Sequence, residues 1–164
     1  MTQQNQTTYT KDPSNKKLFV SREFEADVEK VWRAWTEPAL MDQWWAPKPW
    51  RAETKSMDFR EGGKWLYAMI GPDGTKAYCI VNYESIKPQK SFIGFDAFCD
   101  ENGIINNDFP TMHWKVTFNP IEDGTRVDVE ITFKSEADLE KILEMGFKEG
   151  FAMAHNNLDE LLAK

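Results

Sequence analysis

A long series of alternating segments, separated by turn-forming residues, most constrains what this chain can fold into. Between residues 51 and 133 apolar and polar side chains alternate, which is typical of strands with one buried face. Turn signals separate the segments at Gly62-Gly63, Pro72-Asp73-Gly74, Lys87-Pro88, Asn102-Gly103 and Asp123-Gly124. The pattern predicts an antiparallel meander with strands near 51–59, 63–71, 75–87, 90–99, 111–119 and 125–133.

Helical periodicity flanks this meander on both sides. Before it, alternation from Lys17 predicts a first strand, and the spacing of Val28, Val31, Trp32 and Trp35 predicts a short helix, followed by a second one up to Pro47. After it, a helical pattern begins at Ser135 and predicts one long helix reaching almost to the C-terminus. Seven strands with these helices indicate an α+β fold in which a curved antiparallel sheet wraps around the terminal helix.

Composition limits the domain number and the classes of partner. The chain has 164 residues, of which 41% are apolar and 13% aromatic, enough for one domain with a sizeable core. We expect that domain over residues 17–164, after a disordered tail of residues 1–16 that has little to bury. The net charge of −7 disfavours nucleic acids and anionic membranes. Without an apolar leader or a membrane-spanning stretch, the sequence predicts a cytoplasmic protein with no membrane insertion.

The sequence contains no motif that would predict a metal centre, a cofactor or a catalytic group. Cys79 and Cys99 lie in apolar strand-like segments and are expected to be reduced thiols. His113 and His155 lack the neighbouring residues of a triad or a ligand set. No phosphate-binding loop is present either. We therefore expect no metal, no cofactor and no catalytic residue.

Small residues in the predicted terminal helix suggest a cavity. Gly146, Gly150 and Ala154 recur every four residues and would form one row over the middle of the sheet. A glycine inside a helix costs about 1 kcal/mol relative to alanine, so something bulky is expected to come close to this row. Large sheet residues such as Trp65 or Trp114 would fill the groove in one reading. In the other reading, which we favour, a cavity remains for an apolar ligand.

Arg22 is unusual because alternation places it on the same inward face as Val20 and Phe24. Its guanidinium could pair with a carboxylate, reach the rim of the domain, or bind the carboxylate of a ligand. The tryptophans of the two short helices form either a lid over the sheet edge or the mouth of a pocket. The candidate ligand-binding residues are Arg22, Trp32, Trp44, Trp65, Tyr67, Met69, Trp114, Val116, Met145, Gly146, Gly150, Met153 and Ala154.

Four segments together resemble a known family. They are FEADVEKVWRAWTEPALMDQWWAP (24–47), GGKWLYAMIGPDG (62–74), TMHWKVTFNP (111–120) and GTRVDV (124–129). The chain from Lys17 to Lys164 resembles the activator of heat-shock-protein-90 ATPase-like family, within the START and birch-pollen-allergen-like helix-grip superfamily (SRPBCC). The resemblance implies a deep cavity between the curved sheet and the C-terminal helix, used in that superfamily for lipids, hormones and polyketides.

These observations favour a non-catalytic protein, a monomer or weak dimer, that binds or senses a small hydrophobic or lipid-like molecule. A module that binds a chaperone and activates its ATPase is one alternative, and the partner would then be that chaperone. An enzyme of the cyclase or aromatase type is another, and Arg22, Tyr67 and His155 are its candidate residues because such an enzyme needs a titratable group inside the cavity.

Overall fold

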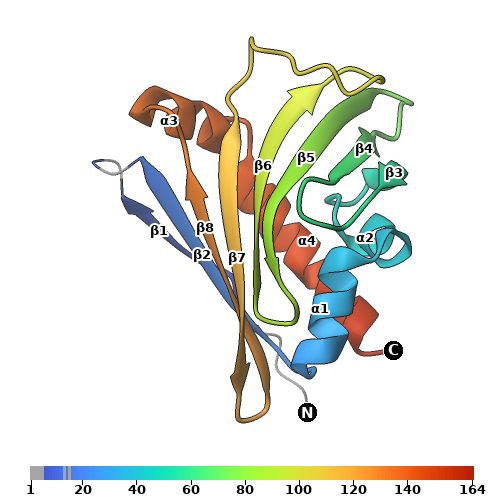
Figure 1. Ribbon diagram of the computed structural model, residues 1–164, viewed down its shortest axis with the longest axis vertical. Coiled ribbons are helices and arrows are strands. Elements are labelled where there is room, and N and C mark those ends of the chain that lie inside the picture. The colour runs from blue at the N-terminus through green and yellow to red at the C-terminus, as the bar shows by residue number, and fades with distance from the viewer. Residues whose placement is uncertain (1–5, 13, 15) are drawn as a thin grey trace.

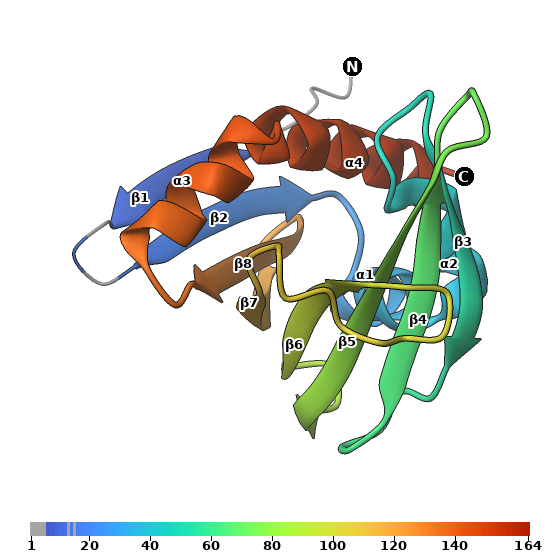
Figure 2. The same ribbon diagram turned by 90° about the horizontal axis from the view of Figure 1, so that it is seen from above.

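Eight antiparallel strands form one sheet in the order β1-β2-β8-β7-β6-β5-β4-β3 (Figure 1). The computed structural model describes residues 6–12, 14 and 16–164. The strands are β1 (Thr8–Asp12), β2 (Lys17–Phe24), β3 (Arg51–Met57), β4 (Lys64–Ile70), β5 (Lys76–Lys87), β6 (Ser91–Cys99), β7 (Met112–Ile121) and β8 (Gly124–Thr132). The sheet curves strongly from β1 on one side to β3 on the other (Figure 2). The predicted α+β helix-grip fold is therefore confirmed.

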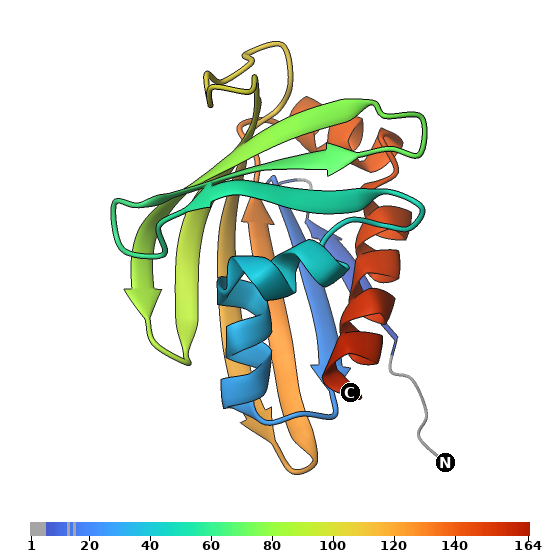
Figure 3. The same cartoon turned by 90° about the vertical axis from the view of Figure 1, so that its right-hand side faces the viewer.

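Helices cover the concave face of the sheet. They are α1 (Val28–Thr36), α2 (Pro38–Trp44), α3 (Glu136–Glu144) and α4 (Phe147–Leu162). Asp27 caps α1 by accepting a hydrogen bond from the Lys30 amide at 2.9 Å, and Ser135 caps α3 through the Asp138 amide. α4 runs across the open side of the curved sheet, and α1 and α2 lie beside its C-terminal half (Figures 2 and 3).

The prediction of one continuous terminal helix was wrong. α3 ends at Glu144, and Gly146 adopts a left-handed conformation with φ of 90° as the N-cap of α4. Glycine adopts this conformation without the steric penalty of a side chain. Gly146 therefore allows the chain to break between two helices. Of the two glycines, Gly150 alone lies inside a helix.

The expectation of a disordered tail was also wrong for part of residues 1–16. Thr8–Asp12 forms β1, an edge strand paired antiparallel with β2. The Tyr9 hydroxyl donates a hydrogen bond to the Lys148 carbonyl oxygen at 2.6 Å, and the Thr7 hydroxyl and Nδ1 of His155 lie 2.7 Å apart in a hydrogen bond. This segment buries little apolar surface that could offset the entropy lost on ordering it. Main-chain pairing and these polar contacts offset that loss instead. Residues 1–5, 13 and 15 of the expected tail lie outside the described part.

Aromatic side chains fill the end of the fold where α1 and α2 pack on the sheet. Trp32 makes edge-to-face contacts with Phe59, Phe92 and Phe118, with ring centroids 5.1–6.1 Å apart. Trp44 is fully buried, and its Nε1 donates to the Ala34 carbonyl oxygen at 2.8 Å. Trp32 and Trp44 are therefore part of the packed aromatic core.

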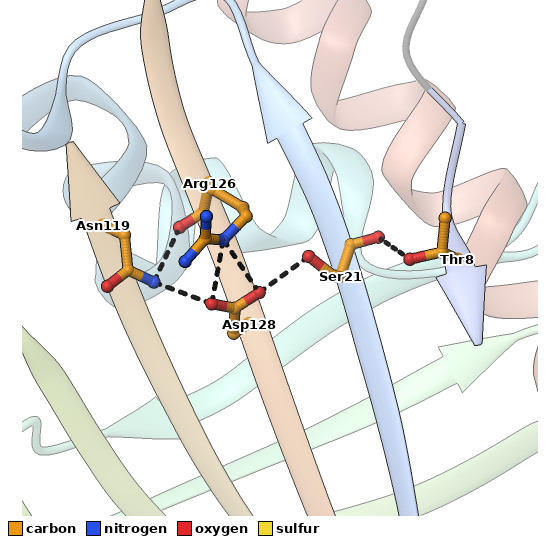
Figure 4. A network of polar contacts seen from close by, with 5 residues as sticks. All are labelled: Thr8, Ser21, Asn119, Arg126 and Asp128. Atoms are coloured by element: carbon orange, nitrogen blue, oxygen red, sulfur yellow. Dashed lines mark hydrogen bonds and ion pairs between the residues drawn. The ribbon is translucent and has the colours of Figure 1, made fainter. Parts of the chain in front are cut away.

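Polar side chains line the convex face of the sheet near β1. Asp128 on β8 accepts hydrogen bonds from Ser21 at 2.7 Å and from Asn119 at 2.8 Å, and it pairs with Arg126 (Figure 4). The Thr8 hydroxyl extends the network by donating to the Ser21 carbonyl oxygen. The network links four neighbouring strands on the side away from the core.

Candidate functional site

A pocket of about 210 Å³ lies between α4 and the concave face of the sheet. It borders the aromatic core, because its wall residue Trp45 contacts Trp35 and Trp44 at ring-centroid distances of 5.6 Å and 5.3 Å. The walls come from β4 to β7, from the segment after α2, and from the junction of α3 and α4. They comprise Trp45, Pro47, Tyr67, Met69, Cys79, Asp96, Phe98, Met112, Trp114, Ile142, Met145, Gly146, Phe147, Gly150 and Phe151.

Strand pairing and ring packing fix the sheet side of this pocket. Tyr67 and Cys79 face each other across β4 and β5 and share a hydrogen bond. The ring of Trp65 stacks on Tyr67 with a centroid distance of 4.0 Å. Trp45, which follows α2, donates from Nε1 to the Tyr67 hydroxyl oxygen at 2.9 Å. The walls are held in place by contacts within the protein, so the pocket is preformed.

Gly150 provides space on the helical side. A Cβ atom added at Gly150 would lie 3.6 Å from Cγ of Pro47, which is an ordinary contact distance. No large side chain of the sheet lies against this position within 4 Å. The void next to Gly150 belongs to the pocket, and α4 approaches Pro47 there with its backbone instead of a side chain.

Asp96 is the polar feature of the pocket that the sequence analysis missed. It lies on β6, opposite Val81 of β5 and Met112 of β7, and its side chain is buried. Burial raises the pKa of its carboxyl from 3.8 to about 7, with the backbone amide of Ala97 partly opposing the rise. The alternation of buried and exposed positions along β6 could have predicted that Asp96 faces inward. Asp96 lies two residues after Gly94 and four after Phe92, and both of these are buried.

Two buried polar atoms of the pocket have no hydrogen-bond partner among the described residues. They are Oδ1 of Asp96 and Nε1 of Trp114. Both residues also line a smaller void of about 30 Å³, which adjoins the pocket through these residues and Trp45. Trp35 borders this void as well, and its Nε1 is a third unpartnered buried atom. Leaving such groups unpaired costs free energy, so their position inside a pocket suggests a partner from a ligand.

The structure brings six of the thirteen predicted site residues together around the pocket. They are Tyr67, Met69, Trp114, Met145, Gly146 and Gly150. Trp65 borders only the smaller void. The other six do not line either space. Trp32, Trp44 and Val116 belong to the packed core, Ala154 is buried, and Met153 is exposed on α4.

Arg22 is part of a buried polar cluster away from the pocket. Its guanidinium forms an ion pair with Asp159 of α4 and donates from Nη1 to Thr7 and Asn156 at 3.0 Å each. The structure thus shows the carboxylate pairing that was one of three predicted alternatives. His155 lies nearby, and burial with the charge of Arg22 lowers its pKa to about 3. Neither residue lines the pocket.

The pocket volume limits the size and chemistry of what it could hold. At about 210 Å³ it is smaller than the roughly 300–1,000 Å³ of typical ligand clefts. Within residues 6–12, 14 and 16–164, no group of three or more His, Cys, Asp or Glu side chains could hold a metal ion. In the same part of the chain, no helix is both long and apolar enough to span a membrane.

Comparisons with known proteins agree with this fold. The family model of the Activator of Hsp90 ATPase homolog 1-like protein matches residues 25–163. A solution NMR structure of a protein from Arthrobacter aurescens is 35% identical, with a TM-score of 0.90, over 95% of this chain and 91% of that chain.

A crystal structure of a protein from Mycobacterium smegmatis is 32% identical, with a TM-score of 0.88, over 95% and 96% of the two chains. A crystal structure from Nitrosomonas europaea, 29% identical with a TM-score of 0.80, covers 92% and 96%. No curated protein matches the chain. Since the family model spans nearly the whole sequence, the chain belongs to the Activator of Hsp90 ATPase homolog 1-like family.

Proposed function

We propose that this protein binds a small, largely apolar molecule in the pocket between α4 and the sheet. One observation carries the proposal: a preformed pocket of about 210 Å³ with aromatic and methionine walls contains a buried carboxyl without a full set of partners. Apolar walls supply affinity through the hydrophobic effect, and Met69, Met112 and Met145 supply surfaces that adapt to a ligand's shape.

The volume sets the expected size of the ligand. An apolar cavity of about 150 Å³ binds benzene. A pocket of about 210 Å³ accommodates one substituted ring, two fused rings or a short branched chain, and a longer molecule would have to extend through the mouth. A small molecule is therefore favoured over a full-length diacyl lipid.

Fluorescence and thermal unfolding with neutral probes test the proposal. We expect N-phenyl-1-naphthylamine, with its naphthalene rings in the pocket and its phenyl ring extending through the mouth, to gain fluorescence on binding. We expect naphthalene to compete with it. We also expect both compounds to raise the melting temperature, because a ligand at 100 times its Kd adds about 2.7 kcal/mol of stability. If no compound of one to two rings binds at its solubility limit, the proposal fails.

Asp96 supports one alternative, an acid–base enzyme of the cyclase or aromatase type. A carboxyl whose pKa is about 7 inside an apolar pocket has the property of a general acid or base. The test is chemical conversion of a bound compound, followed by mass spectrometry, and its loss in Asp96→Asn. A ligand recovered unchanged after prolonged incubation supports binding without catalysis.

Family membership supports a second alternative, activation of a chaperone ATPase. The test measures the ATPase rate of the host's Hsp90 with and without this protein. Stimulation that persists when a ligand fills the pocket would assign the activity to the surface. An unchanged rate, without complex formation, would remove this alternative.

A further inference from the structure

We propose that the ligand carries a hydroxyl group, phenolic or alcoholic, which enters the small void between Asp96 and Trp114 while its apolar part fills the larger pocket. This inference rests on the proposed function and specifies the chemistry of the ligand. It starts from two buried atoms of opposite hydrogen-bonding character on residues that line the same void, Oδ1 of Asp96 and Nε1 of Trp114.

Strand register places these two residues side by side on the concave face. Asp96 pairs with Met112, and Trp114 is two residues further along β7, opposite Gly94. Residues in such diagonal positions have Cα atoms about 7–8 Å apart, which is within reach of long side chains. Gly94 has no side chain, and Cγ1 of Val81 comes within 2.8 Å of the place where its Cβ would lie. Both residues line the small void together with Asp96 and Trp114.

The small void fits one polar group. Its volume of about 30 Å³ exceeds the roughly 10–15 Å³ needed for a single water-sized group. It shares Trp45, Asp96 and Trp114 with the larger pocket, so the two spaces adjoin, and the proposal places one molecule across both. The polar end of the ligand would lie in the small void, at the inner end of the apolar walls.

The donors and acceptors of the unpartnered protein atoms favour a hydroxyl over a carboxylate or an ammonium group. A hydroxyl both donates and accepts, so it satisfies the Asp96 oxygen and an indole N–H together. A ligand carboxylate only accepts, so it could not donate to an ionised Asp96, and the apolar walls would penalise its own charge. A ligand ammonium only donates, and it would leave the indole N–H groups of Trp35 and Trp114 unpaired.

Charge around the pocket agrees with a neutral ligand. Among the described residues, no lysine, arginine or histidine lines the pocket or the small void, and Asp96 is the only aspartate or glutamate that does. Burial favours the protonated form of Asp96 below about pH 7, and a protonated carboxyl also hydrogen-bonds to a hydroxyl. The recognition of a hydroxyl therefore does not depend on the ionisation of Asp96.

A set of ligands with one shape and different polar groups tests the inference. We would measure the affinities of 2-methylnaphthalene, 2-naphthol and 2-naphthylmethylamine by competition with N-phenyl-1-naphthylamine. We expect 2-naphthol to bind about tenfold more tightly than 2-methylnaphthalene, the gain of one to two hydrogen bonds in a buried site. The amine should bind more weakly than 2-naphthol.

Two variants at Asp96 provide the matched control. Asp96→Leu removes the acceptor and should abolish the preference for 2-naphthol while binding 2-methylnaphthalene at least as well. Asp96→Asn keeps an acceptor oxygen and should retain most of the preference. Circular dichroism and the affinity for 2-methylnaphthalene report whether each variant is folded and its pocket intact.

The outcomes separate this inference from the proposed function. Equal binding of 2-methylnaphthalene and 2-naphthol, a tighter amine, or a preference that survives in Asp96→Leu would overturn the hydroxyl assignment and leave an apolar binding site. Absence of binding by all three compounds would overturn both. If Asp96→Leu does not fold, the comparison of the three ligands in the wild-type protein and in Asp96→Asn still decides the inference.

Discussion

Trp45 donates a hydrogen bond from its indole nitrogen to the Tyr67 hydroxyl oxygen at 2.9 Å, and this contact joins the helical side of the pocket to the sheet. Trp45 follows α2, whereas Tyr67 lies in the middle of β4. The two side chains are among the walls of the pocket. The bond therefore sets the spacing of two walls that come from separate parts of the chain.

Tyr67→Phe should loosen this wall. The substitution keeps the ring and its stacking on Trp65 but leaves Nε1 of Trp45 without its acceptor. We expect a loss of about 1 kcal/mol in the free energy of unfolding, the usual net value of one hydrogen bond. Urea denaturation measures it, and Tyr78→Phe on the neighbouring strand is the control. An equal effect of both substitutions would contradict a special role for the Trp45 contact.

Asp96→Asn should change how stability depends on pH. Burial raises the pKa of the Asp96 carboxyl from 3.8 to about 7, so between these values the folded state holds a proton that the unfolded state has lost. The wild-type protein therefore loses up to about 1.4 kcal/mol per pH unit from this group as pH rises through that window. Asparagine does not ionise, so the variant should gain stability relative to wild type from pH 4 to pH 7.

Urea denaturation of both proteins at pH 4.5, 6 and 8 checks this prediction. Above about pH 8 the difference should be constant, because Asp96 is then ionised in both states of the wild-type protein. The pKa of His155 is lowered to about 3, so this residue destabilises the fold as pH falls. Its contribution is the same in both proteins and cancels from the difference between them. A stability difference that stays the same across the three pH values would rule out the raised pKa.

Gly146→Ala and Gly150→Ala should have opposite effects on stability. Gly146 has φ of 90°, a conformation that costs other residues about 1–2 kcal/mol. Gly150 lies inside α4, where alanine is favoured by about 1 kcal/mol and its Cβ would make an ordinary contact with Pro47. Thermal unfolding of both variants gives the comparison. Destabilisation by Gly150→Ala would mean that α4 does not tolerate even a methyl group there.

Gly150→Leu should block the pocket without unfolding α4. Gly150 lines the pocket, and a leucine side chain would occupy part of its 210 Å³. We expect the affinity for N-phenyl-1-naphthylamine to fall at least about tenfold, which corresponds to 1.4 kcal/mol. Met153→Leu, at an exposed position of the same helix, is the control and should leave the affinity unchanged. Unaltered binding in a folded Gly150→Leu variant would place the ligand elsewhere.

Asp159→Asn should destabilise the protein strongly. The variant removes the partner of Arg22, whose side chain is only 2% exposed, and leaves a buried charge without compensation. We expect a loss of about 3 kcal/mol in the free energy of unfolding. Glu160→Gln, which breaks an exposed pair with Lys48, should cost less than about 1 kcal/mol. Similar losses in the two variants would show that the Arg22 pair is not special.

The sequence by itself determined the order of the elements and the faces that are buried. Alternation in segments such as 125–133, together with turn residues, specifies strands, because a strand with one buried face repeats every two residues. Helical spacing before and after the meander does the same for the helices. These are local patterns, and they predicted a curved antiparallel sheet around a terminal helix. The resemblance of four segments to a known family added the helix-grip fold.

Only the tertiary structure decided where the pocket is and which polar groups it contains. Trp32 and Trp44 fill the core whereas Trp45 lines the pocket, although all three lie within one aromatic stretch of sequence. The pairing of β6 with β7 brings Asp96 beside Trp114, and Tyr9 of β1 hydrogen-bonds to Lys148, which is distant in the chain. A void and an unpaired buried atom arise from how distant side chains pack, and no local pattern records that packing.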